Sequence, residues 1–213
     1  MTPRKRAKDL MPPNLSESHS FVFALGSMVV AWGNCETLLL ALMECVAGRP
    51  DAHSAPVVWL SQRNTNARID LVKNLIRLHR KLDDEAPRLF KLLDRFKGVT
   101  RVRNYFCHSG FTVDADSNLC GVYGYSLSLK GAVSQEDRRP LNKALINQVL
   151  DCTDTTRDLI CEFWQAVIDV REILQAQHVG VSEGGRRAAQ DVSPRPHPPP
   201  KPRQKARRKS SEA

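Results

Sequence analysis

Apolar residues recur at steps of three and four over most of residues 16 to 176, and this spacing constrains the fold more than any other feature of the chain. The repeat is clear through Phe21, Met28, Trp32 and Leu39. At 3.6 residues per turn, such side chains lie along one side of an α-helix, where they can be buried together. The pattern therefore predicts helices that pack into a bundle.

The same spacing predicts four main helical regions, at about 16–48, 56–82, 87–107 and 139–176. The polar stretch "SQRNTNAR" leaves open whether the second region is one helix or two. Between the third and fourth regions, apolar residues nearly alternate on both sides of a polar turn at 114–118, which predicts a β-hairpin. The expected fold is mainly α, a four- to five-helix bundle with a short β-hairpin between the third and fourth main helices.

The formal net charge of +9 is concentrated at the two ends of the chain. Residues 178–213 contain nine Lys or Arg and three acidic residues, and the stretch between positions 11 and 177 contains nineteen of each. We expect a disordered basic N-terminus (1–15), a helical domain (16–177) and a disordered, basic, Pro-rich tail (178–213). A basic tail favours polyanions through counterion release, although a tail that only maintains solubility would have the same composition.

The cysteines and the longest apolar stretch indicate in which compartment the protein is expected. The six cysteines form no CxxC pair, and no histidine lies near them at the spacing of zinc ligands. We therefore expect reduced thiols, no metal and a cytoplasmic location. No glycine-rich phosphate loop is present, and no cofactor is expected.

The apolar stretch 21–46 is interrupted by Asn34, Glu36 and Glu44. Because a charge near a bilayer centre costs about 2.5–3.5 kcal/mol, we expect a core helix and no membrane contact.

One short motif contains chemically active side chains. Arg103 and Asn104 are followed by His108, near the end of the third predicted helix. This arrangement resembles the signature of the HEPN superfamily of helical domains, in which an arginine, commonly followed by Asn, Asp or His, precedes a histidine near the end of a long helix. The segment "AWGNCETLLLAL", which contains Glu36, looks like the first helix of such domains.

The resemblance implies a metal-independent endoribonuclease that leaves a 2′,3′-cyclic phosphate. It also implies a homodimer whose two motifs line one cleft, with RNA as the substrate. A toxin or defence effector would further have an antitoxin or a regulatory protein as a partner. In this role His108 would be the general acid/base, because imidazole exchanges protons near neutral pH. Arg103 would stabilise the phosphate charge, and Asn104 would orient either group.

Helix geometry agrees with only part of this assignment. Asn104 and His108 are four residues apart and share a face, whereas Arg103 lies about 140° around an ideal helix from His108. Either the helix unwinds before Gly110, or the arginine and the histidine come together across a dimer. Arg101, seven residues before His108, is on the same face, and we keep it as an accessory phosphate contact.

A second hypothesis is a non-catalytic HEPN-like module that binds a protein partner, a nucleotide or RNA. In that case Asn104 and His108 would hydrogen-bond near the helix end, and Glu36 of the first helix would hold Arg103. In the ribonuclease hypothesis, Glu36 is instead an accessory substrate-binding residue. Both hypotheses use the same few side chains, so the positions of these side chains decide between them.

Overall fold

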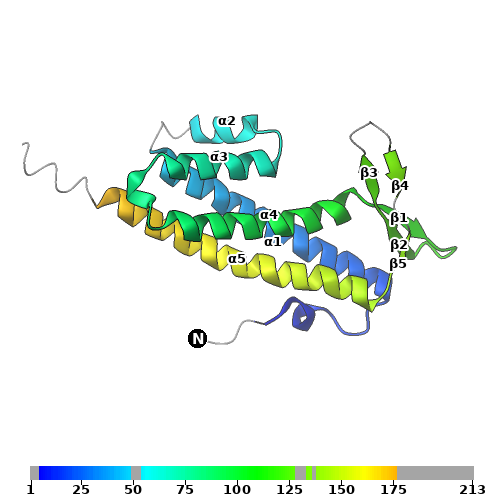
Figure 1. The fold of residues 1–213 in the computed structure, drawn as a ribbon. Coiled ribbons are helices and arrows are strands. Elements are labelled where there is room, and N and C mark those ends of the chain that lie inside the picture. The colour runs from blue at the N-terminus through cyan, green and yellow to red at the C-terminus, as the bar shows by residue number, and fades with distance from the viewer. Residues whose placement is uncertain (1–4, 49–53, 128–132, 136–137, 177–213) are drawn as a thin grey trace, which may run out of the picture. The chain divides into compact units, whose positions relative to one another are not determined.

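The computed structural model describes residues 5–48, 54–127, 133–135 and 138–176. The helices in these ranges are α1 (Glu17–Ala47), α2 (Ser54–Ser61), α3 (Thr65–Arg77), α4 (Ala86–His108) and α5 (Lys143–Gln175). The strands are β1 (Gly110–Val113), β2 (Leu119–Tyr123), β3 (Tyr125–Leu127), β4 (Val133–Gln135) and β5 (Arg139–Pro140). The predicted fold class is confirmed: the protein is mainly α, with a small antiparallel sheet between α4 and α5 (Figure 1). The predicted basic tail at 178–213 lies outside the described residues.

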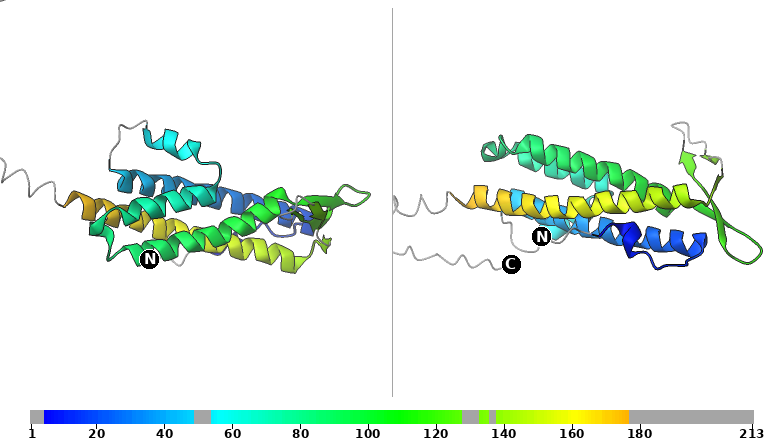
Figure 2. Two further views of the ribbon diagram at one scale, coloured as in Figure 1. Left: turned by 45° about the horizontal axis from the view of Figure 1, so that its top comes forward. Right: turned by 90° about the horizontal axis from the view of Figure 1, so that it is seen from below.

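The three longest helices lie side by side (Figures 1 and 2). α1 and α5 run in the same direction, because the thiol of Cys35 approaches the Thr156 carbonyl oxygen at 3.3 Å and that of Cys45 approaches the Val167 carbonyl oxygen at 4.0 Å. α4 runs in the opposite direction and packs against both helices. All of these helices belong to one compact unit, Met1–Gln175.

Aromatic side chains fill the centre of this unit. The ring of Trp32 on α1 stacks on Phe96 of α4 at 6.2 Å, and Phe96 meets Phe163 of α5 edge-on at 5.6 Å. Phe96 and Phe163 are fully buried. Burying one such side chain contributes about 1.5–3 kcal/mol, so these contacts hold α1, α4 and α5 together.

The ends of α1 follow its sequence signals. Ser16 accepts a hydrogen bond from the backbone N–H of His19, and Gly48 ends the helix with a left-handed φ of 63°. Eleven α1 residues are buried in the bundle. By length and composition alone, α1 could also cross a membrane, and it is the one helix among the described residues that passes this test.

α2 ends and α3 begins within the polar stretch "SQRNTNAR". Asn64 begins α3 by accepting a hydrogen bond from the Ala67 N–H at 2.9 Å. On α2, Ala55 and Trp59 face the bundle, because residues four apart share one side of a helix. The second predicted region is therefore a helical hairpin rather than one helix.

The predicted β-hairpin is present as β1 and β2, which pair antiparallel with Phe111 opposite Val122. In its turn, the Asp114 carboxylate accepts hydrogen bonds from the N–H groups of Asp116 and Asn118, both at 2.9 Å. β5 adds a third strand beside β2, and β3 pairs separately with β4.

Two predicted boundaries are wrong. The last helix begins at Lys143 and not at 139, because Arg139 and Pro140 pair with β2 and the Asn142 side chain then caps α5 by accepting from the Leu145 N–H at 3.0 Å. The N-terminus, predicted to be disordered through residue 15, contains a 3-10 helix at Ala7–Leu10. The Ala7 N–H donates to Asp154 of α5 at 2.8 Å, and this long-range contact has no local signal in the sequence.

Candidate functional site

The predicted motif lies on the last two turns of α4. The helix continues without a break to His108, and Ser109 then adopts an extended conformation while its hydroxyl donates to the Tyr105 carbonyl oxygen at 2.6 Å. The helix therefore does not unwind between Arg103 and His108. As a result, Arg103 and His108 lie on different sides of α4, about 140° apart.

Arg103 is partly buried at the contact between α4 and α1. Its guanidinium carbon lies 4.2 Å from the centroid of the Trp32 ring, and one guanidinium nitrogen donates to the Asn104 side-chain oxygen at 2.8 Å. The Trp32 ring is itself fixed, because its N–H donates to the Thr100 hydroxyl at 3.0 Å. The Nε atom of Arg103 is buried and has no hydrogen-bond partner among the described residues. The structure thus brings Arg103 and Asn104 together and holds both in place.

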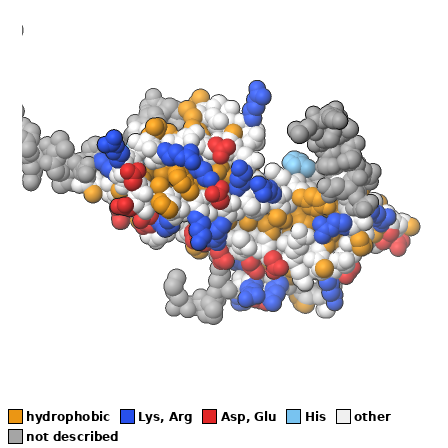
Figure 3. All heavy atoms as spheres, in the orientation of Figure 1, with side chains coloured by type: hydrophobic (Ala, Val, Ile, Leu, Met, Phe, Trp, Pro, Cys, Tyr) orange, Lys and Arg blue, Asp and Glu red, His pale blue; other side chains and the backbone are white. Residues whose placement is uncertain are grey.

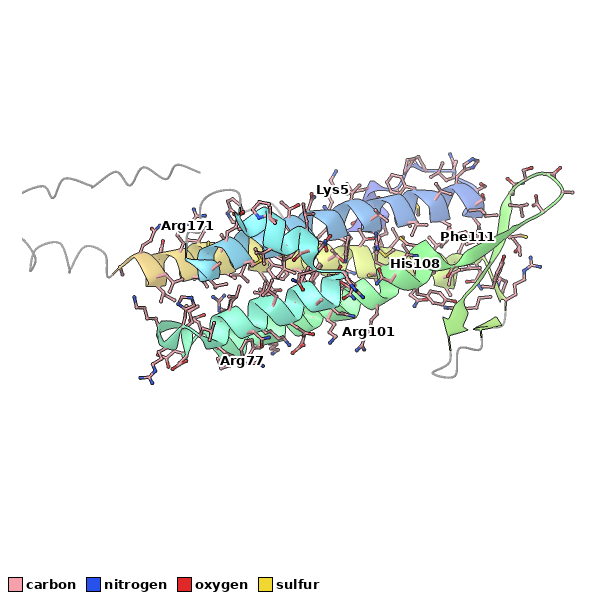
Figure 4. All side chains as sticks on the ribbon, turned by 90° about the horizontal axis from the view of Figure 1, so that it is seen from above. Lys5, Arg77, Arg101, His108, Phe111 and Arg171 are labelled. Atoms are coloured by element: carbon pink, nitrogen blue, oxygen red, sulfur yellow. The ribbon has the colours of Figure 1, made fainter. Side chains whose placement is uncertain are left out.

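His108 has a different environment. Its side chain is exposed at the end of α4, and no residue in the described ranges forms a hydrogen bond or an ion pair with it. Arg101, on the same side of the helix, is also exposed (Figure 4). An imidazole open to solvent and not engaged within the described part of the chain can exchange protons with a bound substrate.

Glu36 does not hold Arg103. One carboxylate oxygen accepts from Arg68 of α3 at 2.7 Å and from the Thr65 hydroxyl at 3.0 Å. Arg68 also lies over the ring of Trp59, with its guanidinium carbon 4.9 Å from the ring centroid. Glu36 therefore ties α1 to the helical hairpin, and its side chain is only 17% exposed. Sequence reasoning missed Arg68 and Thr65, although both lie in or beside the polar stretch that it identified.

The backbone around the motif is fixed by aromatic contacts. Phe106, which is fully buried, meets Phe21 of α1 at 5.9 Å and Tyr105 at 5.1 Å. At Gly110 an added Cβ would overlap the Tyr123 ring, so glycine allows β2 to cross close to the end of α4. The end of the helix that presents His108 is therefore anchored on two sides.

Two of the six cysteine thiols, those of Cys35 and Cys152, are buried in the bundle. None of the six cysteines, all of which lie in the described ranges, forms a disulfide bond. Burial raises the pKa of Cys35 to about 12 and also raises the pKa of Cys152, so both stay protonated and unreactive near neutral pH. Within the part of the chain that the structure describes, no three His, Cys, Asp or Glu side chains are grouped so that they could hold a metal ion.

A cavity of about 580 Å³ lies away from the motif. It is bounded by the N-terminal segment, the outer side of α1 and α5, and its lining includes Leu10, Val22, Val30, Thr153 and Ile160. None of the residues that the sequence assigns to the site borders this cavity. The candidate site at the end of α4 is thus separate from this cavity.

Comparisons with known proteins add no relative: no family model, no curated protein and no solved structure matches the chain. The function therefore has to be argued from the residues and their geometry.

Proposed function

We propose that this protein is a metal-independent endoribonuclease of the HEPN type that acts as a homodimer. The observation that carries the proposal is the exposed imidazole of His108, which has no partner in the described ranges and follows the fixed Arg103–Asn104 pair on the same helix. A histidine and an arginine supply the proton exchange and the phosphate stabilisation that RNA cleavage needs without a metal.

The reaction can be written for these groups. The neutral His108 imidazole accepts the proton of a ribose 2′-hydroxyl, and the 2′-oxygen attacks the adjacent phosphorus. The bond from phosphorus to the 5′-oxygen breaks, and that oxygen takes a proton from water. The hydroxide left behind then takes the proton from His108, which returns the imidazole to its neutral form. The products are a 2′,3′-cyclic phosphate and a 5′-hydroxyl end. An arginine beside the phosphate stabilises the negative charge of the pentacoordinate transition state.

The dimer supplies that arginine. Within one chain, Arg103 lies about 140° from His108 on a continuous helix. In the proposed arrangement, Arg103 of one chain therefore works with His108 of the partner subunit. Asn104 holds the guanidinium of its own chain at 2.8 Å and so fixes its orientation.

The proposal is tested by incubating the purified protein with mixed-sequence RNA in excess EDTA. We expect cleavage that leaves 2′,3′-cyclic phosphate ends and that does not occur on DNA of the same sequence. Metal-independent chemistry predicts the same rate with and without EDTA. Absence of any cleavage, or cleavage that EDTA abolishes, would show that the proposed activity is wrong.

A mixing experiment tests the shared site. Arg103→Ala and His108→Ala should each be inactive alone, because every site lacks one group. Co-refolding them in equal amounts should restore about a quarter of wild-type activity, since half of the dimers are mixed and each mixed dimer contains one intact site of two. Each variant refolded by itself is the control. No recovery in the mixture would contradict a site that is shared between chains.

The second candidate function is a non-catalytic RNA-binding module. It is favoured by one specific observation: within the chain, the Arg103 guanidinium packs on Trp32 at 4.2 Å, on a different side of α4 from His108. An arginine in this position stabilises the contact between α1 and α4 without catalytic work. Binding of RNA without cleavage in the EDTA experiment would identify this function.

A further inference from the structure

We propose that Arg63, in the turn between α2 and α3, and Arg101, on α4, bind the backbone phosphates that flank the phosphodiester placed at His108. The position of the cleaved bond rests on the proposed function, whereas the phosphate-binding surface does not. The ligand chemistry is a polynucleotide backbone, which RNA and DNA share.

The register between α3 and α4 brings the two arginines together. The two helices are antiparallel: the Lys73 ammonium lies 2.6 Å from an Asp94 carboxylate oxygen, and Arg77 lies over the Phe90 ring at 5.0 Å. In both pairs the two residue numbers sum to 167. Continuing this register to the beginning of α3 places the α2–α3 turn, and with it Arg63, alongside the part of α4 that follows Arg101.

The exposed side of α4 continues the same surface toward the histidine. Lys97, Arg101, Asn104 and His108 follow each other at intervals of four, three and four residues. They therefore lie within about 60° of one another around an ideal helix. Arg101 precedes His108 by roughly 10 Å along the helix axis, so its guanidinium serves a neighbouring phosphate rather than the one that is cleaved.

The charges on this surface are available to a ligand. Arg63 and Arg101 are exposed, and neither forms an ion pair with any residue of the described ranges. Glu36 of α1 is already paired with Arg68 at 2.7 Å. Asp70, the acid of α3, is exposed and lies in register with Lys97 rather than with Arg101. On the face drawn in Figure 3, Lys and Arg side chains lie over α3 and the adjoining part of α4, with acidic side chains between some of them and a histidine nearby.

Unpaired cations bind polynucleotides by releasing the counterions condensed on the phosphates, so each contact adds to the salt dependence of binding. The test is a salt titration of the full chain with a fluorescently labelled, short 2′-O-methyl RNA, which cannot be cleaved. Replacing both Arg63 and Arg101 with alanine should weaken binding roughly tenfold. The slope of log affinity against log salt should fall by about 1.4, or about 0.7 for each lost phosphate contact on a single strand.

The matched control removes the same number of charges elsewhere. Arg77 and Arg171 are exposed and lie toward the opposite end of the bundle from His108 (Figure 4). Alanine at both positions should leave the salt slope within about 0.3 of wild type. Circular dichroism of both double variants verifies that the helices are retained.

An unchanged slope in the Arg63→Ala/Arg101→Ala variant would overturn this inference, and so would an equal fall in the control variant. Single-stranded DNA of the same sequence should show the same loss of slope, and a loss confined to RNA would contradict phosphate binding. RNA cleavage decides the proposed function separately. If the protein binds RNA with the expected slopes but does not cleave it, the phosphate-binding surface is supported and the proposed nuclease activity is wrong. If the protein cleaves RNA but the double variant has an unchanged slope, the nuclease activity is supported and the phosphate-binding surface is wrong.

Discussion

Alanine at position 108 is expected to slow RNA cleavage by about 100- to 10,000-fold, the usual contribution of a general acid or base. The protein should stay folded, because the His108 side chain is exposed and bonds to no residue that the structure describes. The initial rate of cleavage of a labelled RNA in EDTA, together with the circular dichroism spectrum, measures both effects.

His19 offers a matched control. It is also exposed, and its ring hydrogen-bonds the Ser16 hydroxyl at 2.8 Å at the start of α1. Alanine at position 19 should leave the cleavage rate within about twofold of wild type, because a surface substitution away from the site changes little. A His108→Ala protein that keeps more than about a tenth of the rate, or a His19→Ala protein with an equal loss, would remove His108 from the chemistry.

The parts of the fold that sequence predicted well are those with local signals. The long apolar periodicities predict α1, α4 and α5, and the cap at Ser16 and the left-handed Gly48 define the ends of α1. The start of the last helix was missed because Arg139 and Pro140 are held by pairing with β2. That contact depends on the register of the hairpin, and the spacing of the residues after position 139 gives no information about this register.

The candidate site, too, could be predicted only where local helix geometry determines it. The angle between Arg103 and His108 follows from helix geometry alone, and the continuous helix of the structure agrees with it. The partner of each arginine could not be predicted. Arg68 contacts Glu36 and Arg103 contacts Trp32, and these two α1 residues are one helical turn apart. The spacing of the sequence does not say which arginine pairs with the carboxylate and which packs on the ring.

The end of α4 depends on an aromatic cluster that joins three elements. Phe21 of α1 lies 5.9 Å from both Phe106 of α4 and Phe111 of β1. Phe106 is fully buried, and its ring also meets Tyr105 edge-on at 5.1 Å. Because His108 follows Phe106 by two residues, this cluster fixes the backbone that presents the imidazole.

Phe106→Ala is therefore expected to lower the free energy of unfolding by about 3–5 kcal/mol, because it removes a buried ring and leaves a cavity between α1 and α4. Urea denaturation followed by circular dichroism measures the change. Trp164→Ala is the control: this side chain is 60% exposed on α5, and its loss should cost less than about 1 kcal/mol. If Phe106→Ala is no more destabilising than Trp164→Ala, the aromatic cluster does not anchor the end of α4, and the position of His108 must be set by other contacts.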